Sequence, residues 1–137
     1  MAGSQAEVKV AIATDDDVVA ARQAGRQLAE SLGLATTDLT LVATAISEVA
    51  RNITAYAGNG EIVVRPVDGK GRRGVQVIAS DRGPGIEDIE RALQDGFTTG
   101  GGLGLGLPGA RRLMDEFAIS SRPGAGTTVT MTKWGPQ

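Results

Sequence analysis

Two polar side chains, Glu48 and Asn52, stand four positions apart in the mainly apolar stretch "LTLVATAISEVARNITAYA". In a helix, residues at this spacing share one face, so a carboxylate would lie beside an amide oxygen. An amide oxygen can ligate Mg²⁺, and a carboxylate can take a proton from an attacking hydroxyl or hold a water molecule. The pair therefore suits a magnesium–nucleotide site. A solvated polar helix face is the alternative that this pair alone leaves open.

A second candidate is the segment "DRGPGI", Asp81 to Ile86, which follows an apolar run typical of a strand. A carboxylate at the end of a strand can accept a hydrogen bond from a ligand's amino group. Gly83 and Gly85 would then let a flat ring approach the backbone. A turn closed by the Asp side chain fits the same residues, so both interpretations stay open.

The third candidate is the glycine-rich run "FTTGGGLGLGLPGARRLMDEF", residues 97–117. Its G-x-G-x-x-G (Gly104, Gly106, Gly109) lacks the preceding strand and the later acidic residue of a dinucleotide-binding fingerprint. The sequence contains no G-x-x-x-x-G-K-[ST], and without histidine it cannot contain the H-R-D motif of the protein-kinase fold. Bare amides ahead of a helix N-terminus still suit an anion. A phosphate-binding segment and a disordered loop both remain possible interpretations.

The composition narrows the class of protein. The 137 residues include 14 Lys and Arg against 16 Asp and Glu, and a net charge of −2 favours neither nucleic acid nor an anionic membrane as partner. The absence of cysteine and histidine excludes disulfides, thiolate zinc sites, a Ser-His-Asp triad and a phosphohistidine on this chain. No apolar run reaches the length of a membrane span, and no signal peptide is recognisable. We therefore expect one cytoplasmic domain covering residues 1–137.

Hydrophobic periodicity predicts the elements that must position these candidates. Strands are expected at 7–14, 61–67, 74–81, 118–123 and 126–134, and helices at 15–33, 36–58, 87–95 and 108–117. The aspartates at 15–17 are expected to provide the N-cap and the acidic first turn of the first helix. The second helix should bury one stripe of side chains, Leu41, Val42, Ala45, Ile46, Val49 and Ile53. This order predicts an α/β (α+β) two-layer sandwich, with a mixed, mostly antiparallel sheet of about five strands and helices on one face.

Together and in this order, E-x-x-x-N, D-x-G-x-G, the glycine-rich run before a helix and G-T-T in a strand resemble the GHKL ATP-binding superfamily, whose members share the Bergerat fold. The likeness covers nearly the whole chain. The stretches "TAISEVARNITAYAGNGEI" and "DRGPGIEDIERALQDGFTTGGGLGLGLPGARRLMDEF" and the terminal "KW" are similar to the RsbT-type switch kinases of the bacterial stressosome.

The resemblance implies a role for each matching residue. Glu48 would act as general base or orient the attacking group, and Asn52 would ligate Mg²⁺. Asp81 would bind the adenine amino group of ATP, with Gly83 and Gly85 shaping the pocket. Three glycines around the phosphates and two threonines beside the adenine complete the implied site: Gly102, Gly104, Gly106, Thr127 and Thr128. Residues 95–107 contain no Lys or Arg, so the cation facing the γ-phosphate stays open, with Arg51 one candidate.

The resemblance also implies a function and partners. The chain would be an ATP-dependent serine/threonine kinase that phosphorylates STAS-domain partners and, once released, activates an output protein such as a PP2C-type phosphatase. Neither nucleic acid nor a membrane is expected to bind. One alternative is a partner-switching module that sequesters a sigma factor, with nucleotide as an allosteric ligand; another is an α/β domain that binds no nucleotide. Glu48 favours the kinase, because a pure binding module needs no base.

Overall fold

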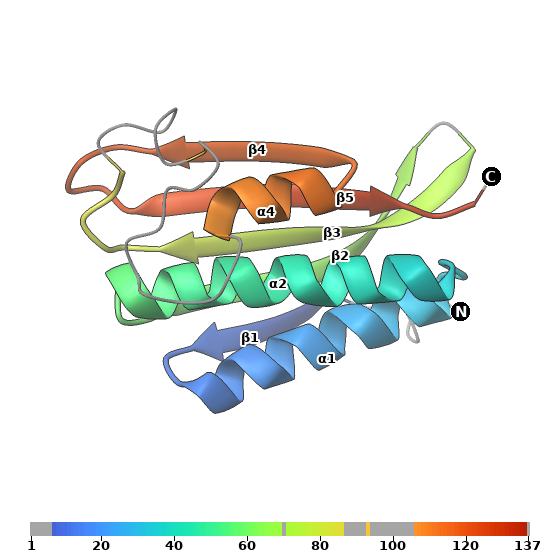
Figure 1. The fold of residues 1–137 in the computed structure, drawn as a ribbon, viewed down its shortest axis with the longest axis horizontal. Coiled ribbons are helices and arrows are strands. Elements are labelled where there is room, and N and C mark those ends of the chain that lie inside the picture. Colours follow the sequence, from blue (N-terminus) through green and yellow to red (C-terminus); the bar gives the residue numbers. More distant parts are fainter. Residues whose placement is uncertain (1–6, 70, 87–92, 94–105, 137) are drawn as a thin grey trace.

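The structure, a computed structural model, describes residues 7–69, 71–86, 93 and 106–136 (Figure 1). In chain order its elements are β1 (Val8–Ile12), α1 (Asp15–Ser31), α2 (Thr36–Tyr56), β2 (Gly60–Gly69), β3 (Arg72–Asp81), α4 (Gly106–Leu113), β4 (Glu116–Ser121) and β5 (Thr127–Trp134). The helix expected at 87–95 and the glycines 102 and 104 lie outside the described residues, apart from Leu93.

The five strands form one sheet in the order β1-β2-β3-β5-β4, with the three helices on one face (Figure 1). The prediction of a mixed sheet needs one correction: within the described residues, each of the four neighbouring strand pairs is antiparallel. After α4 the chain forms β4 at the edge of the sheet. The β4–β5 hairpin then places β5 between β4 and β3, and β5 pairs with β3 in antiparallel orientation as well.

The core lies between the sheet and α2, which runs between α1 and α4 (Figure 1). Its sheet side consists of alternate strand residues, Ile62, Val64, Val75, Val77, Ala79, Val129 and Met131, all buried. The stripe predicted for α2 is confirmed, with Leu41 only half-buried. Packing between α1 and α2 is close enough that a Cβ on Gly25 would collide with the Ile46 side chain. The long helix is therefore fixed against both of its neighbours.

Helix α1 is capped by Thr14, whereas the sequence pattern placed the cap among the aspartates that follow. The Thr14 hydroxyl accepts a hydrogen bond from the Asp17 amide, and the Asp17 carboxylate accepts one from the Thr14 amide, which closes a capping box. Hydrogen bonds from the backbone amides of Ala13 and Thr14 lower the pKa of Asp17 below its ordinary value of 3.8. The aspartates at 15–17 form the acidic first turn instead, as predicted.

The predicted helix at 108–117 also needs correction, because α4 begins at Gly106 and ends at Leu113. The last residues of that prediction belong to β4, where Phe117 pairs with Met131 of β5. The change of direction is fixed by Asp115, whose amide donates to the Thr132 carbonyl and whose carboxylate accepts from the Trp134 amide. Pairing with β5 thus overrides the helical periodicity of the sequence.

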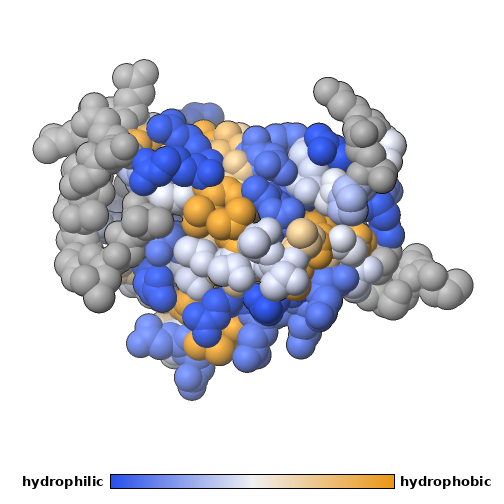
Figure 2. All heavy atoms as spheres, turned by 45° about the vertical axis from the view of Figure 1, so that its right-hand side comes forward, coloured by the Kyte–Doolittle hydropathy of each residue, from blue (hydrophilic) through white to orange (hydrophobic). Residues whose placement is uncertain are grey.

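On the face of the molecule shown in Figure 2, apolar side chains form small areas separated by polar ones. The large apolar residues that stay exposed in the described part are Val8, Val19 and Tyr56. None of the helices that the structure describes is long and apolar enough to cross a membrane.

Candidate active site

Glu48 is a buried carboxylate with both oxygens engaged. Its side chain lies on α2 and is only 8% exposed. Oε1 accepts a hydrogen bond of 2.9 Å from the amide of Gly106, the first residue of α4, and Oε2 lies 3.4 Å from Nη1 of Arg51. A buried carboxylate needs such donors because burial removes it from water. Glu48 therefore connects α2 with the start of the helix that follows the glycine-rich run.

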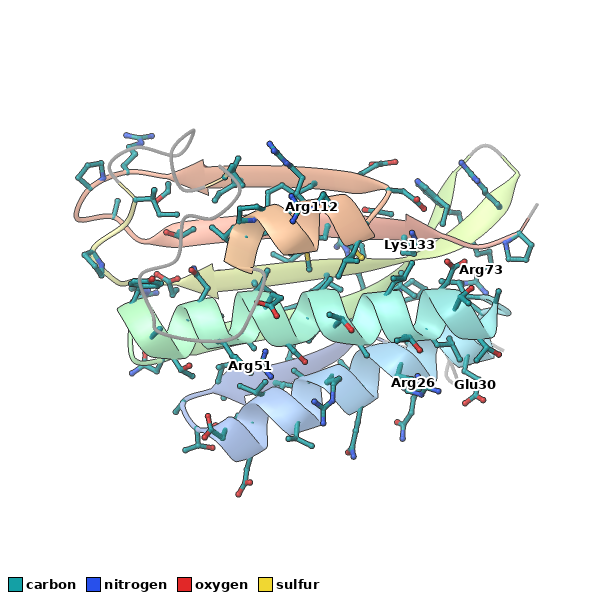
Figure 3. All side chains as sticks on the ribbon, viewed as in Figure 1. Arg26, Glu30, Arg51, Arg73, Arg112 and Lys133 are labelled. Carbon is teal, nitrogen blue, oxygen red and sulfur yellow. The ribbon has the colours of Figure 1, made fainter. Side chains whose placement is uncertain are left out.

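Asn52 lies one turn beyond Glu48 on α2 and is half-buried, so the predicted i, i+4 pair shares one helix face. Arg51, between them in sequence, has a side chain that is 54% exposed and lies against α2 (Figure 3). Among the described residues, no group of three or more His, Cys, Asp and Glu side chains could hold a metal ion. A magnesium ion at Asn52 would thus need other oxygen ligands, of the kind that phosphates and water supply.

Asp81 is the last residue of β3 and lies in a row of residues that crosses all five strands. The register places Ile12, Gly60, Asp81, Thr127 and Ser121 side by side, on the sheet face that the helices cover. Oδ1 of the Asp81 carboxylate accepts a hydrogen bond of 2.9 Å from the Gly83 amide. The turn closed by an Asp side chain, one of the two interpretations of "DRGPGI", is therefore present and uses one carboxylate oxygen.

The two threonines of the G-T-T motif point to opposite faces of the sheet, because side chains alternate along a strand. Thr127 lies directly opposite Asp81 and is buried. Thr128 pairs with Ser80 and Ser120 and faces the side without helices. The structure therefore brings Thr127 beside Asp81 and separates Thr128 from it.

Glycines are required around Asp81 by close backbone approach. A Cβ on Gly83 would lie 2.6 Å from the Cβ of Ala57, just past the end of α2. Gly85 and Gly126 have φ values of +79° and +82°, and a Cβ on either would collide with a backbone carbonyl, of Arg122 and of Asp81 respectively. The loop after β3 is thus packed tightly against both α2 and the β4–β5 turn.

Helix α2 sets the spacing between the two groups of candidate residues. Ala57, which contacts the Gly83 loop, follows Glu48 by nine residues, or about 13 Å along the helix axis. Figure 1 shows the end of β3 and the β4–β5 turn at the same end of the molecule as the C-terminal end of α2. The two groups of candidate residues therefore lie more than two helical turns apart along α2.

Comparison with known proteins shows the family of this chain. Residues 11–133 match the family described as "Histidine kinase-like ATPase domain". The chain is 53% identical over 125 residues to the serine/threonine-protein kinase RsbT of Bacillus subtilis (strain 168), covering 91% of this chain and 94% of that protein. The chain belongs to the histidine kinase-like ATPase family. Within it, the chain is an RsbT-type serine/threonine protein kinase, as the sequence predicted, and the family implies ATP binding.

More distant members of the family include anti-sigma F factors. That of Caldanaerobacter subterraneus subsp. tengcongensis is 39% identical over an alignment of 99 residues that covers 68% of either chain. Among solved structures, the RsbU and RsbW domains of Rv1364c from Mycobacterium tuberculosis superpose with a TM-score of 0.62 at 22% identity, over 95% of this chain and 33% of that one. The mycobacterial sensor histidine kinase MprB gives 0.55 at 16% identity, over 96% and 97%. These likenesses confirm the Bergerat fold.

Sequence reasoning missed one residue of this RsbT-type kinase, Ser121. Its hydroxyl contacts Thr127, the Gly126 carbonyl and the Ile86 amide. The Ile86 contact joins residues 35 positions apart, so no local pattern marks it. Only the register of β4 against β5 brings Ser121 to Thr127.

Proposed function

We propose that the chain phosphorylates a serine or threonine of a STAS-domain partner in a stressosome, using ATP and Mg²⁺, in the cytoplasm. After release it would activate an output protein, such as a PP2C-type phosphatase. We treat residues 1–137 as a single kinase domain. The buried Glu48 carboxylate, held between α2 and the start of α4 one turn from Asn52, is the observation that carries this proposal.

Glu48 would act as the general base. Its carboxylate takes the proton of the partner's hydroxyl while the hydroxyl oxygen bonds to the γ-phosphorus and the bond to the leaving ADP oxygen breaks. The contacts from Gly106 and Arg51 orient the carboxylate, whose two oxygens keep lone pairs for further hydrogen bonds. Asn52 would hold Mg²⁺, which when bound supplies the positive charge that phosphoryl transfer needs.

Beside the C-terminal end of α2, Asp81 and Thr127 would accept hydrogen bonds from the adenine amino group, Thr127 directly or through water. Gly83 lets the loop after β3 lie close to Ala57, and Gly85 lets it lie close to the β4–β5 turn. We assign Gly102 and Gly104 to the phosphates; the amide of Gly106, the third glycine of that expectation, already donates to Glu48. Thr128 faces the other side of the sheet, and we leave it out of the proposed site.

The test is phosphate transfer from ATP to a cognate STAS-domain protein with Mg²⁺, read by mass spectrometry of the partner. Glu48→Gln keeps the shape of the side chain but removes the base, so we expect transfer to fall by about 10²- to 10⁴-fold. Glu30→Gln, the same change at an exposed position of α1, is the matched control and should transfer at the unsubstituted rate. Undiminished transfer by Glu48→Gln would contradict the assigned mechanism.

A second candidate function is sequestration of a sigma factor. It is favoured by the identity with anti-sigma F factors, 38–39% over 99 residues. Capture of native partners with and without ATP separates the two. Recovery of a sigma factor would favour sequestration, whereas recovery of STAS-domain proteins or a phosphatase would support the kinase.

A further inference from the structure

Ser121, the last residue of β4, makes three hydrogen-bond contacts with one hydroxyl group. Its Oγ lies 2.7 Å from the Ile86 amide nitrogen, 2.9 Å from the Gly126 carbonyl oxygen and 2.9 Å from Oγ1 of Thr127. These partners belong to the loop after β3, the β4–β5 turn and the start of β5. The hydroxyl therefore joins the three segments around Asp81.

The chemistry of the partners determines where each proton lies. A carbonyl oxygen can only accept, so the single proton of Ser121 goes to Gly126; an amide can only donate, so Ile86 donates to Ser121. With its proton committed, Ser121 can only accept from Thr127. The reverse assignment would leave the carbonyl of Gly126, a buried residue, without its donor, which is costly.

The Thr127 hydroxyl thus donates its own proton to Ser121, so only its lone pairs remain available to another group. Beside it in the row stands Asp81, whose ionised carboxylate also only accepts. A ligand that reaches this part of the sheet therefore meets two hydrogen-bond acceptors, Asp81 and Thr127, and no donor from the Thr127 hydroxyl. The amino group of a ligand can donate to these acceptors, whereas a carbonyl oxygen in the same place would face their lone pairs.

We propose that Ser121 is a positioning residue that sets base specificity: by fixing the direction of the Thr127 hydroxyl, it favours a 6-aminopurine over a 6-oxopurine. The inference rests on the proposed nucleotide site. Ser121 itself does not touch the base. Its substitution should change the ratio of affinities for the two purines, a quantity that a purely structural role would leave constant.

The experiment is calorimetric titration of the full chain with ATP and with inosine triphosphate, its 6-oxo analogue, in the presence of Mg²⁺. In Ser121→Ala the Thr127 proton is free to turn toward a carbonyl, so the preference for ATP should fall by about fivefold to tenfold, the effect of one hydrogen bond. Ser121→Thr keeps the hydroxyl and should keep the preference. Ser120→Ala, on the opposite face of the same strand, is the matched control and should not change it.

Thr127→Val supplies an independent test if Ser121→Ala does not fold. It removes the lone pairs themselves, so it too should lower the preference for ATP, and adding Ser121→Ala should then change nothing further. An unchanged preference in folded Ser121→Ala, or in Thr127→Val, would overturn this inference while leaving the kinase proposal intact. If the unsubstituted chain binds no ATP, the proposed function fails and this inference fails with it.

Discussion

Near the C-terminal end of α2, the loop after β3 packs closely against both Ala57 and the β4–β5 turn, whereas Glu48, more than two turns earlier on α2, is held by one backbone amide and one guanidinium. Around Asp81, Gly83 approaches Ala57 and Gly126 approaches the Asp81 carbonyl, so several glycines are required. Around Glu48, one amide from Gly106 and one guanidinium from Arg51 provide the contacts. The side chains proposed to bind the base would thus be held in place by close backbone packing, and the Glu48 carboxylate by two hydrogen-bond contacts.

The largest effect on stability is expected at the Asp81 end. Gly126→Ala places a Cβ against the Asp81 carbonyl at a φ of +82°, so we expect the free energy of unfolding to fall by about 3 kcal/mol. Chemical denaturation measures it. Gly124→Ala, also at positive φ but with open space around the added Cβ, is the control and should lose less than half as much. Equal losses would show that close approach to Asp81 is unimportant.

Asp81→Asn is expected to weaken ATP binding by about tenfold or more, because a hydrogen bond to a charged acceptor is lost or reversed. The Gly83 amide can donate to the side-chain oxygen of an asparagine as readily as to a carboxylate, so the stability of the fold should change little. Calorimetric titration measures the affinity for ATP, and thermal melting measures the stability of the fold. An unchanged affinity for ATP would remove Asp81 from the base-binding site.

Arg51→Ala tests the Glu48 end. The side chain of Arg51 is 54% exposed, so its ion pair should contribute less than about 1 kcal/mol to stability. Loss of a group that orients the base should instead lower kcat, by about tenfold, with the KM for ATP nearly unchanged. Arg51→Lys should restore part of the rate, and Arg26→Ala, an exposed arginine on α1, serves as control (Figure 3). A change in KM alone would place Arg51 on the phosphates.

The smallest effect is expected at Asp17, which belongs to neither region. Its pKa is lower in the folded chain than 3.8, so its carboxylate stabilises the fold above that pH. This contribution is lost as the pH falls through the lowered pKa of the folded state. The melting temperature of Asp17→Asn should therefore be lower than that of the unsubstituted chain at neutral pH, and the two melting temperatures should converge in acid. A constant difference at every pH would contradict the capping role, and ATP affinity should not change.

Periodicity in the sequence was enough to predict the strands, the long helix α2 and the shared face of Glu48 and Asn52. The order of the strands, the end of α4 at Leu113 and the choice of Thr127 over Thr128 as the neighbour of Asp81 were not predictable in this way, because each depends on pairing between distant strands. The role of Ser121 likewise depends on a bond to an amide 35 positions away.

We infer that α2 separates base recognition at Asp81 and Thr127 from chemistry at Glu48 within one ATP site. A crystal structure with Mg²⁺ and a non-hydrolysable ATP analogue tests it most directly. We predict the adenine amino group within hydrogen-bonding distance of Asp81, and the γ-phosphate beside Glu48 and Asn52. Adenine bound elsewhere, or a γ-phosphate far from Glu48, would contradict the account.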